Sequence, residues 1–360
     1  MLRKFIIGGG KYLRKQVYNI GFLYSIYYRY SLSRRIVLDT TFIENMRRYR
    51  VENIEGCLDN YYKKYCRIRF MTGATQEEFF LLDFYHKTQK QIQGYMTDYI
   101  LHQNLWNMDA GAVKDESEFE DKKVLYKLLP ELFGRRLISV SKESNYEDFE
   151  KFVTNASKII LKPNYACMGR GIFATTINNV GEAKILYQAL ISLGGEWIVE
   201  EWIVQDETMA IWNDTSVNTI RFYSTLDQFG NYNNLTPVLR TGRKGSVIDN
   251  AGSGGIFANI DMNTGQVITD GIDENGNYYT CHPDSKVVYK NWQVPEWESL
   301  CKLVKNLHKS KLKHHRYIGW DWAYSSQNGW ILIEANWGQF LNQYADKIGR
   351  RNEFLKYVGK

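Results

Sequence analysis

Residues 317–340, YIGWDWAYSSQNGWILIEANWGQF, constrain the fold of this chain more than any other stretch. Apolar and polar residues alternate in two runs around a short polar segment, which predicts two antiparallel strands joined by a turn. If residues 327–328 are the centre of the turn, Asp321 pairs with Glu334 across the ladder. Asn336 then lies two residues further along the same face of the hairpin.

Like charges that face each other across a sheet repel, and a hard divalent cation between them removes the repulsion. Mg²⁺ binds carboxylate and amide oxygens and keeps positions open for phosphate. The three polar side chains of this hairpin are therefore candidate metal ligands. On this stretch alone, the solvated polar face of an ordinary hairpin is still the favoured explanation. The choice depends on the residues upstream.

The composition is that of a globular protein with an unevenly distributed charge. A chain of 360 residues is long enough for two or three domains, and 44% hydrophobic residues with 24% charged residues disfavour disorder. The net charge is +6, but the first 70 residues alone hold 15 Lys and Arg against 5 Asp and Glu. A basic N-terminal block on a slightly acidic body favours contact with an anionic surface.

The cysteines indicate reduced thiols in a cytoplasmic protein. The five cysteines are scattered, with no CxxC pair, which argues against a disulfide framework and against a zinc site. The pairs 281–282 (Cys-His) and 314–315 (His-His) lack ligand spacing and are expected in core or surface roles. The N-terminus has no signal-peptide pattern, and its longest uncharged run, residues 16–28, is too short to span a bilayer.

Residues 1–50 mix cations with aromatic rings, and no acidic residue precedes Asp39. Two interpretations stay open for this block. It forms an amphipathic helix at the inner face of a membrane, with its tyrosines at the headgroup level. Alternatively, it packs its aromatic side chains on the body and leaves its cations in water. Nucleic acid is not expected as a partner, because no recognition motif accompanies the charge.

Hydrophobic periodicity divides the chain into three parts and predicts an α+β fold. Residues 1–107 form a mainly helical region, in which Thr75 and Glu78 resemble a capping box. Residues 108–203 and 204–360 form two α+β parts that follow a polar linker. Strands are predicted at 158–163, 196–203, 218–226, 234–242 and 255–261, and helices at 181–193 and 294–312.

Two further segments suit a nucleotide. The segment CMGRGI, residues 167–172, follows a strand that ends near Lys162, and glycines let backbone amides approach a phosphate. A lone G-R-G is more often a hairpin, and a lysine at a strand end is often only a snorkelling surface residue. In EWIVEEWIVQDE, the acidic residues suit an adenosine, although for this segment alone a surface strand is the favoured explanation; they are Glu200, Glu201 and Glu207.

The order and spacing of these elements resemble the ATP-grasp superfamily. The elements are Lys122, Lys162 with its glycine-rich loop, the EEWI segment, and Asp321 followed by Glu334-x-Asn336. Several other stretches resemble its sugar-transfer-associated branch, namely SVNTIRFYS, RTGRKGSVIDNAGSGGIFANID, CHPDS, VPEW, YIGWDWA and LIEANWGQF. The resemblance covers roughly residues 75–345 and implies two α+β subdomains that clasp ATP, preceded by the helical region.

The resemblance also implies a role for each matching residue. ATP phosphates would be held by Lys122, or by Lys123 in a competing register, and by Lys162. The phosphate-covering loop would contain Gly169, Arg170 and Gly171. The adenosine would be met by Glu200, Glu201, Trp202, Ile203 and Glu207. Mg²⁺ would be bound by Asp321, Glu334 and Asn336. A transferring phosphoryl group or a substrate carboxylate would be met by Arg221, Arg240, Arg243 and Asn250.

Two positions depart from the pattern of the family. Many members have an arginine two residues before the first metal carboxylate, whereas this chain has Gly319, so Arg221 or Arg240 must substitute for it. The phosphate loop is also bulkier than usual, because Cys167 and Met168 stand where small or polar residues are common.

The implied reaction is ligation of a carboxylate to an amine with Mg²⁺ and ATP, through an acyl phosphate. The resemblance implies that an amino acid or similar group is attached to a sugar in cell-surface polysaccharide biosynthesis. The partners would be small or glycan-linked carboxylates and amines. A lipid-linked glycan at a membrane would suit the basic N-terminus. Two alternatives stay open: a phosphotransferase that acts on a hydroxyl group, and a nucleotide-binding scaffold without catalysis.

Overall fold

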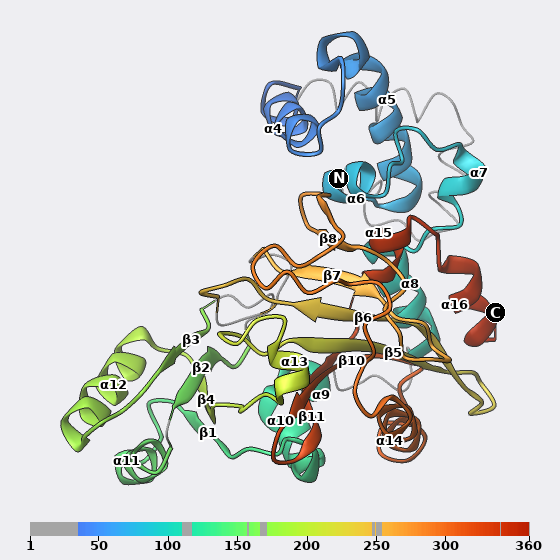
Figure 1. Ribbon diagram of the computed structural model, residues 1–360. Helices are drawn as coiled ribbons and strands as arrows, with labels where there is room; N and C mark the ends of the chain where they lie inside the picture. Colours follow the sequence, from blue (N-terminus) through green and yellow to red (C-terminus); the bar gives the residue numbers. More distant parts are fainter. Residues whose placement is uncertain are drawn as a thin grey trace. The chain divides into compact units, whose positions relative to one another are not determined.

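The computed structural model describes residues 35–109, 117–156, 158–165, 171–246, 249, 254–338 and 340–359 (Figure 1). The chain divides into two compact units. The first contains the chain up to Asn107 together with Lys347–Asn352, and the second contains Met108–Asp346 and Glu353–Lys360. The sequence gives no sign that residues 347–352 join the first unit. Of the basic block, residues 1–50, for which membrane binding and packing on the body both stay open, residues 1–34 lie outside the described residues.

The first unit is helical in its described part, as the periodicity predicts. Its helices are α4 (Arg35–Arg48), α5 (Ile54–Thr72), α6 (Gln76–Leu81), α7 (Gln89–Ile92) and α8 (Asp98–Asp109), which runs on to the unit boundary. The predicted capping box is confirmed, because Thr75 accepts from the backbone N–H of Glu78 and the Glu78 carboxylate accepts from that of Thr75. Buried rings form the centre of this unit: Phe42, Tyr62, Tyr65, Phe79 and Phe80.

The smaller sheet of the second unit has four antiparallel strands in the order β1-β4-β2-β3. They are β1 (Leu137–Val140), β2 (Ile159–Pro163), β3 (Phe173–Thr175) and β4 (Trp197–Glu201). Two helices, α11 (Tyr146–Thr154) and α12 (Val180–Leu193), pack on it through a common apolar core (Figure 1). Phe149 and Leu190 lie at the centre of this core, each 1% exposed. β1 and α11 were not predicted individually.

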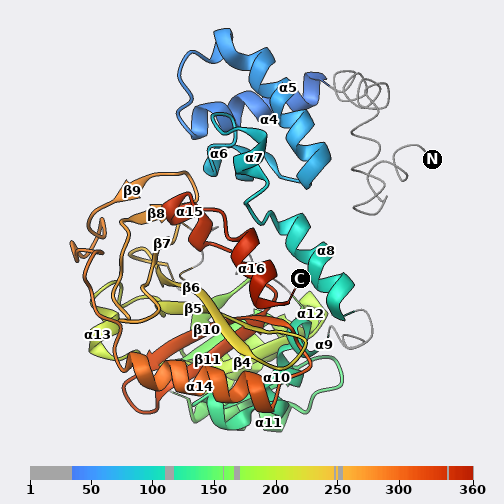
Figure 2. The ribbon, with the colours of Figure 1, turned by 90° about the vertical axis from the view of Figure 1, so that its right-hand side faces the viewer.

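The larger sheet has seven antiparallel strands in the order β11-β10-β5-β6-β7-β8-β9. They are β5 (Thr219–Leu226), β6 (Tyr232–Thr241), β7 (Ile256–Asn259), β8 (Gly271–Asp273), β9 (Tyr278–Tyr279), β10 (Tyr317–Ser325) and β11 (Gly329–Asn336). The helix α14 (Trp297–Ser310) covers one face of this sheet, as Figure 2 shows. The remaining helices of the second unit are α9 (Ser117–Glu120), α10 (Lys122–Leu128), the 3₁₀ turn η1 (Pro130–Leu132), α13 (Glu207–Ala210), α15 (Asn342–Asp346) and α16 (Arg351–Tyr357).

Alternation along β5 and β10 decides where the polar side chains go. Phe222, Trp320 and Trp322 are fully buried in the core beneath α14. Each such side chain stabilises the fold by about 1.5–3 kcal/mol, which fixes the face that the strands present to the core. Because neighbouring residues point to opposite faces, Arg221 and Asp321 must lie on the other face of the sheet.

The turn of the β10–β11 hairpin differs from the prediction, but the predicted pair forms. Ser325 pairs with Gly329, so the loop has three residues, 326–328, and that register alone would place Asp321 opposite Ile333. A β-bulge between Asp321 and Trp322 shifts the register by one residue and brings Asp321 opposite Glu334. The predicted α+β fold class is confirmed. Among the helices in the described ranges, none combines the length and apolarity that spanning a bilayer requires.

Candidate ATP and metal site

Asp321 is the centre of a buried ionic cluster on the polar face of the larger sheet. Arg221 lies directly opposite it on β5 and donates from both Nε and Nη2, the latter at 2.7 Å from Oδ2. Arg240 on β6 donates from Nη1 to the same Oδ2 at 3.1 Å. Burial alone would raise the pKa of the Asp321 carboxyl, but the two guanidinium groups outweigh it and hold the pKa at about 2. Asp321 is therefore an anion with two cationic partners.

Glu334 faces the same cluster, and its pKa is shifted in the opposite direction. Desolvation, followed by the nearby Asp321 charge, raises the pKa of its carboxyl group. Asn336 donates from Nδ2 to Glu334 Oε1 at 3.1 Å, while its own Oδ1 is buried without a hydrogen bond from any described residue. Among the described residues, no cation forms an ion pair with the Glu334 carboxyl group, and no donor reaches Asn336 Oδ1. A hard cation can bind both oxygen groups. These residues fit Mg²⁺, which Glu334 and Asn336 would hold.

Glycine at position 338 keeps this space open. A β-carbon there would lie 2.0 Å from Arg221 Nη1 and 2.5 Å from Asn336 Oδ1. Any larger residue would therefore displace the arginine that holds Asp321. The backbone of Gly338 is also held in place, because the hydroxyl of Tyr317 donates to the Gly338 carbonyl oxygen at 2.6 Å. Packing against the ionic cluster therefore explains why position 338 is a glycine.

Lys162 lies at the end of β2 in a second buried ion pair. Its Nζ is 2.5 Å from Glu200 Oε1, and Arg135 donates from Nε to Glu200 Oε2 at 2.8 Å. Burial would raise the pKa of Glu200, but Arg135 and Lys162 lower it to about 2. Lys162 also acts electrostatically on Glu334, so the ammonium group and the hairpin carboxylates belong to one charged region. Glu200 thus positions the lysine, and its predicted contact with adenine stays a prediction.

Both candidate lysines of α10 lie beside the end of β2. Lys122 donates from Nζ to the carbonyl oxygen of Asn164 at 2.6 Å. Lys123 is 2.7 Å from Glu196 Oε1 and also near Asp121, and these carboxylates raise its pKa. Lys123 is thus held by carboxylates, whereas Lys122 is directed at the backbone that leads into the predicted phosphate loop. Which of the two lysines meets ATP stays a prediction.

The predicted adenosine residues lie at the end of β4 and beyond it. Glu201 forms an ion pair with the exposed Arg136, Nη2 to Oε1 at 2.5 Å. Trp202 donates its backbone N–H to the Lys158 carbonyl at 2.9 Å, and its ring lies 3.5 Å from Lys158 Nζ. Within the described part of the chain, no hydrogen bond is made by the backbone N–H of Ile203, which leaves a donor for a base edge. Glu207 is exposed at the start of α13.

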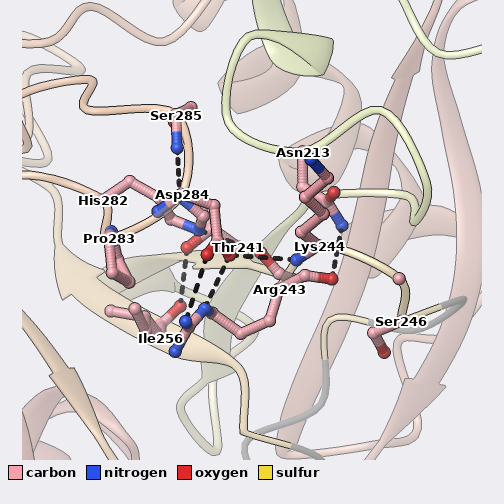
Figure 3. A network of polar contacts seen from close by, with 12 residues as sticks. Asn213, Thr241, Arg243, Lys244, Ser246, Ile256, His282, Pro283, Asp284 and Ser285 are labelled. Atoms are coloured by element: carbon pink, nitrogen blue, oxygen red, sulfur yellow. Dashed lines mark hydrogen bonds and ion pairs between the residues drawn. The ribbon is translucent and has the colours of Figure 1, made fainter.

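Arg243 lies in a different network, which Figure 3 shows. It donates from Nε to Asp284 Oδ2 at 2.7 Å, and the backbone N–H of Lys244 donates to the same oxygen at 3.0 Å. His282 makes a hydrogen bond with the Gly242 carbonyl, 2.9 Å long. These contacts hold residues 242–246 in place, and no described contact joins Arg243 to Asp321.

Part of the predicted phosphate loop lies outside the described residues, as does Asn250. These residues are Cys167, Met168, Gly169 and Arg170. Gly171 is described and has φ = +74°, with Pro163 Cγ only 3.1 Å from where a β-carbon would be. Both the left-handed backbone and the close proline require glycine at this position.

Two members of the charged region were not predicted. Arg135 bonds Glu200 and also donates from Nη1 to the Leu332 carbonyl on β11 at 2.9 Å, which ties the two sheets together. Asp249 accepts from Arg240 at 3.1 Å and from the Thr219 hydroxyl. In the sequence, Arg135 stands beside the exposed Arg136, and no local signal separates the two. Asp249 directly precedes Asn250, which was predicted as a site residue, and this proximity is the signal that could have identified Asp249.

The histidine pair 314–315 also has a described partner. The two imidazoles approach one carboxylate oxygen, Glu118 Oε2, each through Nε2 at 2.7 Å. The three side chains therefore offer ligand atoms within 4.8 Å of one another. The hydrogen bonds themselves account for this close approach, because burial lowers the pKa of His315 to about 4 and leaves a neutral imidazole beside the carboxylate.

The fold and the charged cluster together define a protein of the ATP-grasp class. A model of the sugar-transfer-associated ATP-grasp family matches residues 114–359. The chain belongs to this family, and the resemblance drawn from the sequence is confirmed. ATP-grasp enzymes are ATP-dependent ligases. Among curated proteins, no match to the chain is found.

Solved structures that the chain matches at low identity include ligases. D-alanyl-alanine synthetase A from Vibrio cholerae is 10% identical, with a TM-score of 0.41 over 67% of this chain and 63% of that one. L-amino acid ligase from Bacillus licheniformis is 12% identical, with a TM-score of 0.39 over 63% and 42%. D-alanine–D-alanine ligase from Coxiella burnetii is 9% identical, with a TM-score of 0.36 over 61% and 48%. This chain thus spans less than two thirds of the length of each of these relatives.

Proposed function

We propose that the protein is a Mg²⁺- and ATP-dependent carboxylate–amine ligase that acts through an acyl phosphate. The observation that carries the proposal is the cluster of Lys162, Arg221, Asp321 and Glu334, beside which the amide oxygen of Asn336 is buried without a donor from any described residue. A lysine, an arginine and oxygen ligands for a cation are the parts that hold a triphosphate and neutralise its transfer. Bound Mg²⁺ would supply charge neutralisation at the phosphate oxygens.

The reaction has two steps in this proposal. A substrate carboxylate oxygen attacks the γ-phosphorus of ATP, the bond to the β-phosphate oxygen breaks, and ADP leaves. The nitrogen of the amine then attacks the acyl carbon, the bond to phosphate breaks, and the amine gives up a proton. Lys162 binds phosphate oxygens, and Glu200 with Arg135 keeps its ammonium group in place. Positioning and electrostatics supply most of the rate enhancement in such transfers.

Arg221 and Arg240 have a second use in this scheme. Both bind Asp321 in the described arrangement, and either could replace the arginine that many family members have at position 319, where this chain has glycine. Glu334 and Asp321 would hold the cation, whose charge would offset that of the carboxylates. The guanidinium groups of Arg221 and Arg240 would then bind a substrate carboxylate or a phosphoryl group in a bidentate manner. We assign this role to Arg221 first, because Gly338 packs directly against it.

The substrate belongs to the proposal as well. The family name associates these proteins with sugar transfer. We infer that an amino acid or similar group is joined to a sugar during cell-surface polysaccharide biosynthesis. A glycan carried on a lipid would suit the 15 cations among the first 70 residues. Binding to liposomes of anionic lipid at low salt tests that last point, and a protein that ignores them contradicts it.

The reaction is tested by measuring ADP release with Mg·ATP and pools of carboxylates, including amino acids and uronic acids. Hydroxylamine is present in each assay, because it traps an acyl phosphate as a hydroxamate. Hydroxamate formed together with ADP supports the ligase, and the active pool names the carboxylate class. ADP with a stable phosphorylated product and no hydroxamate contradicts the ligase and identifies a phosphotransferase. ATP binding without turnover in any pool favours a scaffold.

A further inference from the structure

The first unit contains a cavity of its own, with a volume of about 360 Å³. One wall is a single face of α5, where residues recur at helical spacing, and the other wall is the segment around α7. The α5 wall includes Asn60, Lys63, Lys64, Arg67, Ile68 and Met71. A volume of this order lies at the lower end of small-molecule sites in proteins. All the lining residues belong to the first unit, so this cavity is separate from the site of Asp321.

Four cations line this cavity: Lys63, Lys64, Arg67 and Lys87. Among the described lining residues, none is acidic. Lys63 and Arg67 lie four residues apart on α5, and like charges at this spacing destabilise a helix. The arrangement thus concentrates positive charge at a concave surface, at the expense of the helix that carries it.

Two of the lysines are held in place by carbonyl oxygens. Lys64 donates from Nζ to the carbonyls of Tyr85 and Lys87, at 2.8 and 2.7 Å. Lys87 donates from Nζ to the carbonyl of Leu82 at 2.8 Å. Burial lowers the pKa of both lysines, and for Lys87 the charge of Asp83 opposes this effect. Since an ammonium group has three N–H donors, each lysine is fixed in position and still has a donor to offer.

The base of the cavity is apolar. Ile68 and Ile92 are buried, 6% and 4% exposed, and Met71 is partly buried beside them. Lysine and arginine stems add further aliphatic surface beneath their charged ends. An inorganic anion would use the charges and leave this apolar surface in contact with water. A ligand that matches the whole cavity has an anionic head and an apolar chain.

We propose that this cavity binds a phosphate group that carries an apolar chain, with the phosphate near Lys63, Lys64 and Arg67 and the chain against Met71 and Ile92. A phosphate group carries up to two charges and three acceptor oxygens, which suits several converging N–H donors better than a single carboxylate does. The site goes beyond the proposed ligase activity. It holds or falls independently of that activity, because its test uses neither ATP nor turnover.

The test is a calorimetric titration of the full chain with dodecyl phosphate, kept below its micelle-forming concentration. Inorganic phosphate and the uncharged dodecyl maltoside are titrated in parallel. The pocket variant Lys63→Glu/Arg67→Glu reverses two exposed cations of the cavity. The matched control Arg47→Glu/Lys90→Glu reverses two exposed cations of the same unit that do not line the cavity. Both variants change the net charge by the same amount.

The proposal predicts that dodecyl phosphate binds at least tenfold more tightly than inorganic phosphate or dodecyl maltoside. It also predicts that the pocket variant weakens this binding at least tenfold, while the control variant keeps it within twofold. Equal affinity for inorganic and dodecyl phosphate would show a plain phosphate site and overturn the proposal. Equal binding by the two variants would place the ligand elsewhere, for instance on residues 1–34, and would also overturn it. So would the absence of binding.

Discussion

At the scale of single residues, the two carboxyl groups that face each other on the hairpin have pKa values that are shifted in opposite directions. The arginines lower the pKa of Asp321 to about 2, whereas desolvation and Asp321 raise that of Glu334. A sequence shows two acidic residues and predicts two equal anions. The asymmetry depends on which carboxylate the guanidinium groups reach, and that is decided by the register of β5 against β10.

The first prediction concerns Glu334→Gln. Because the pKa of Glu334 is raised, a neutral amide of the same shape should leave the urea midpoint of unfolding unchanged or higher. The same substitution removes a negatively charged cation ligand, so ATP turnover should fall by about 100-fold or more. Urea unfolding and ADP release measure the two effects. The control is Glu298→Gln, which alters an exposed pair with Lys302 on α14. Loss of both stability and turnover would contradict the proposed electrostatic state of Glu334.

At the scale of elements, the hairpin shows what a sequence predicts and what it does not. Alternation predicted both strands and the Asp321–Glu334 pair. The three-residue loop and the bulge next to Asp321 were not predicted, because each shifts the register by one and the two shifts cancel at this pair. Between the bulge and the loop, the residue pairs are shifted by one from those that a two-residue turn at 327–328 predicts. The agreement at Asp321 therefore depends on an irregularity that local patterning does not reveal.

The second prediction compares the adjacent arginines that precede β1. Arg135 belongs to a buried pair with Glu200, where both side chains are 3% exposed, whereas Arg136 pairs with Glu201 at the surface. Arg135→Met leaves a buried carboxylate without one of its cations and should destabilise the fold by about 3–5 kcal/mol. Arg136→Met should change stability by about 1 kcal/mol or less. Urea unfolding of the two variants tests this, and equal effects would contradict the structural role given to Arg135.

The third prediction concerns His308, which joins α14 to the larger sheet. Ser224 makes a 2.7 Å hydrogen bond with His308 Nδ1, and the Ser224 oxygen accepts from Trp320 Nε1 at 2.8 Å. His308 Nε2 lies 2.8 Å from the carbonyl of His315. A neutral imidazole protonated at Nε2 satisfies this chain of hydrogen bonds. Desolvation lowers the pKa of His308 to about 4.

The sign of the pH effect follows from that lowered pKa. In the unfolded chain His308 takes up a proton near pH 6.5, whereas the folded protein resists it until about pH 4. The contribution of His308 to the free energy of unfolding is thus fully present above pH 6.5. As the pH falls toward 4, up to about 3 kcal/mol of this free energy is lost. Denaturant unfolding between pH 7 and pH 4.5 should show a smaller pH slope for His308→Gln than for His86→Gln, which alters an exposed histidine. Equal slopes would contradict this role.

At the scale of the whole molecule, the sequence predicted more of the second unit than of the first. Ordered motifs identified the family over residues that the family model also matches, and the strand and helix periods gave the α+β class. The contribution of residues 347–352 to the first unit could not be predicted, because it depends on contacts across more than 200 positions, such as Arg351 N–H to the Gly94 carbonyl at 2.9 Å. The cationic cavity was equally hidden, since α5 and α7 are brought together only by folding.

The charged region of the second unit also depends on distant contacts. Lys162, Glu200 and Arg135 come from the smaller sheet and the segment before it, whereas Arg221, Asp321 and Glu334 come from the larger one. Motifs named most of these residues. The partners that set their charges were not predictable, because a pKa depends on burial and on neighbours that the sequence does not place.

Calorimetric titration with Mg·ATP tests most directly the claim that these two sets of residues form one nucleotide site. The wild type should bind Mg·ATP, and both Lys162→Met, from the smaller sheet, and Glu334→Gln, from the larger one, should bind it at least about tenfold more weakly. Lys127→Met, which removes an exposed lysine of α10, should bind like the wild type. If Lys162→Met and Glu334→Gln both retained wild-type affinity, Mg·ATP would not be held by this cluster, and the proposed site would be contradicted.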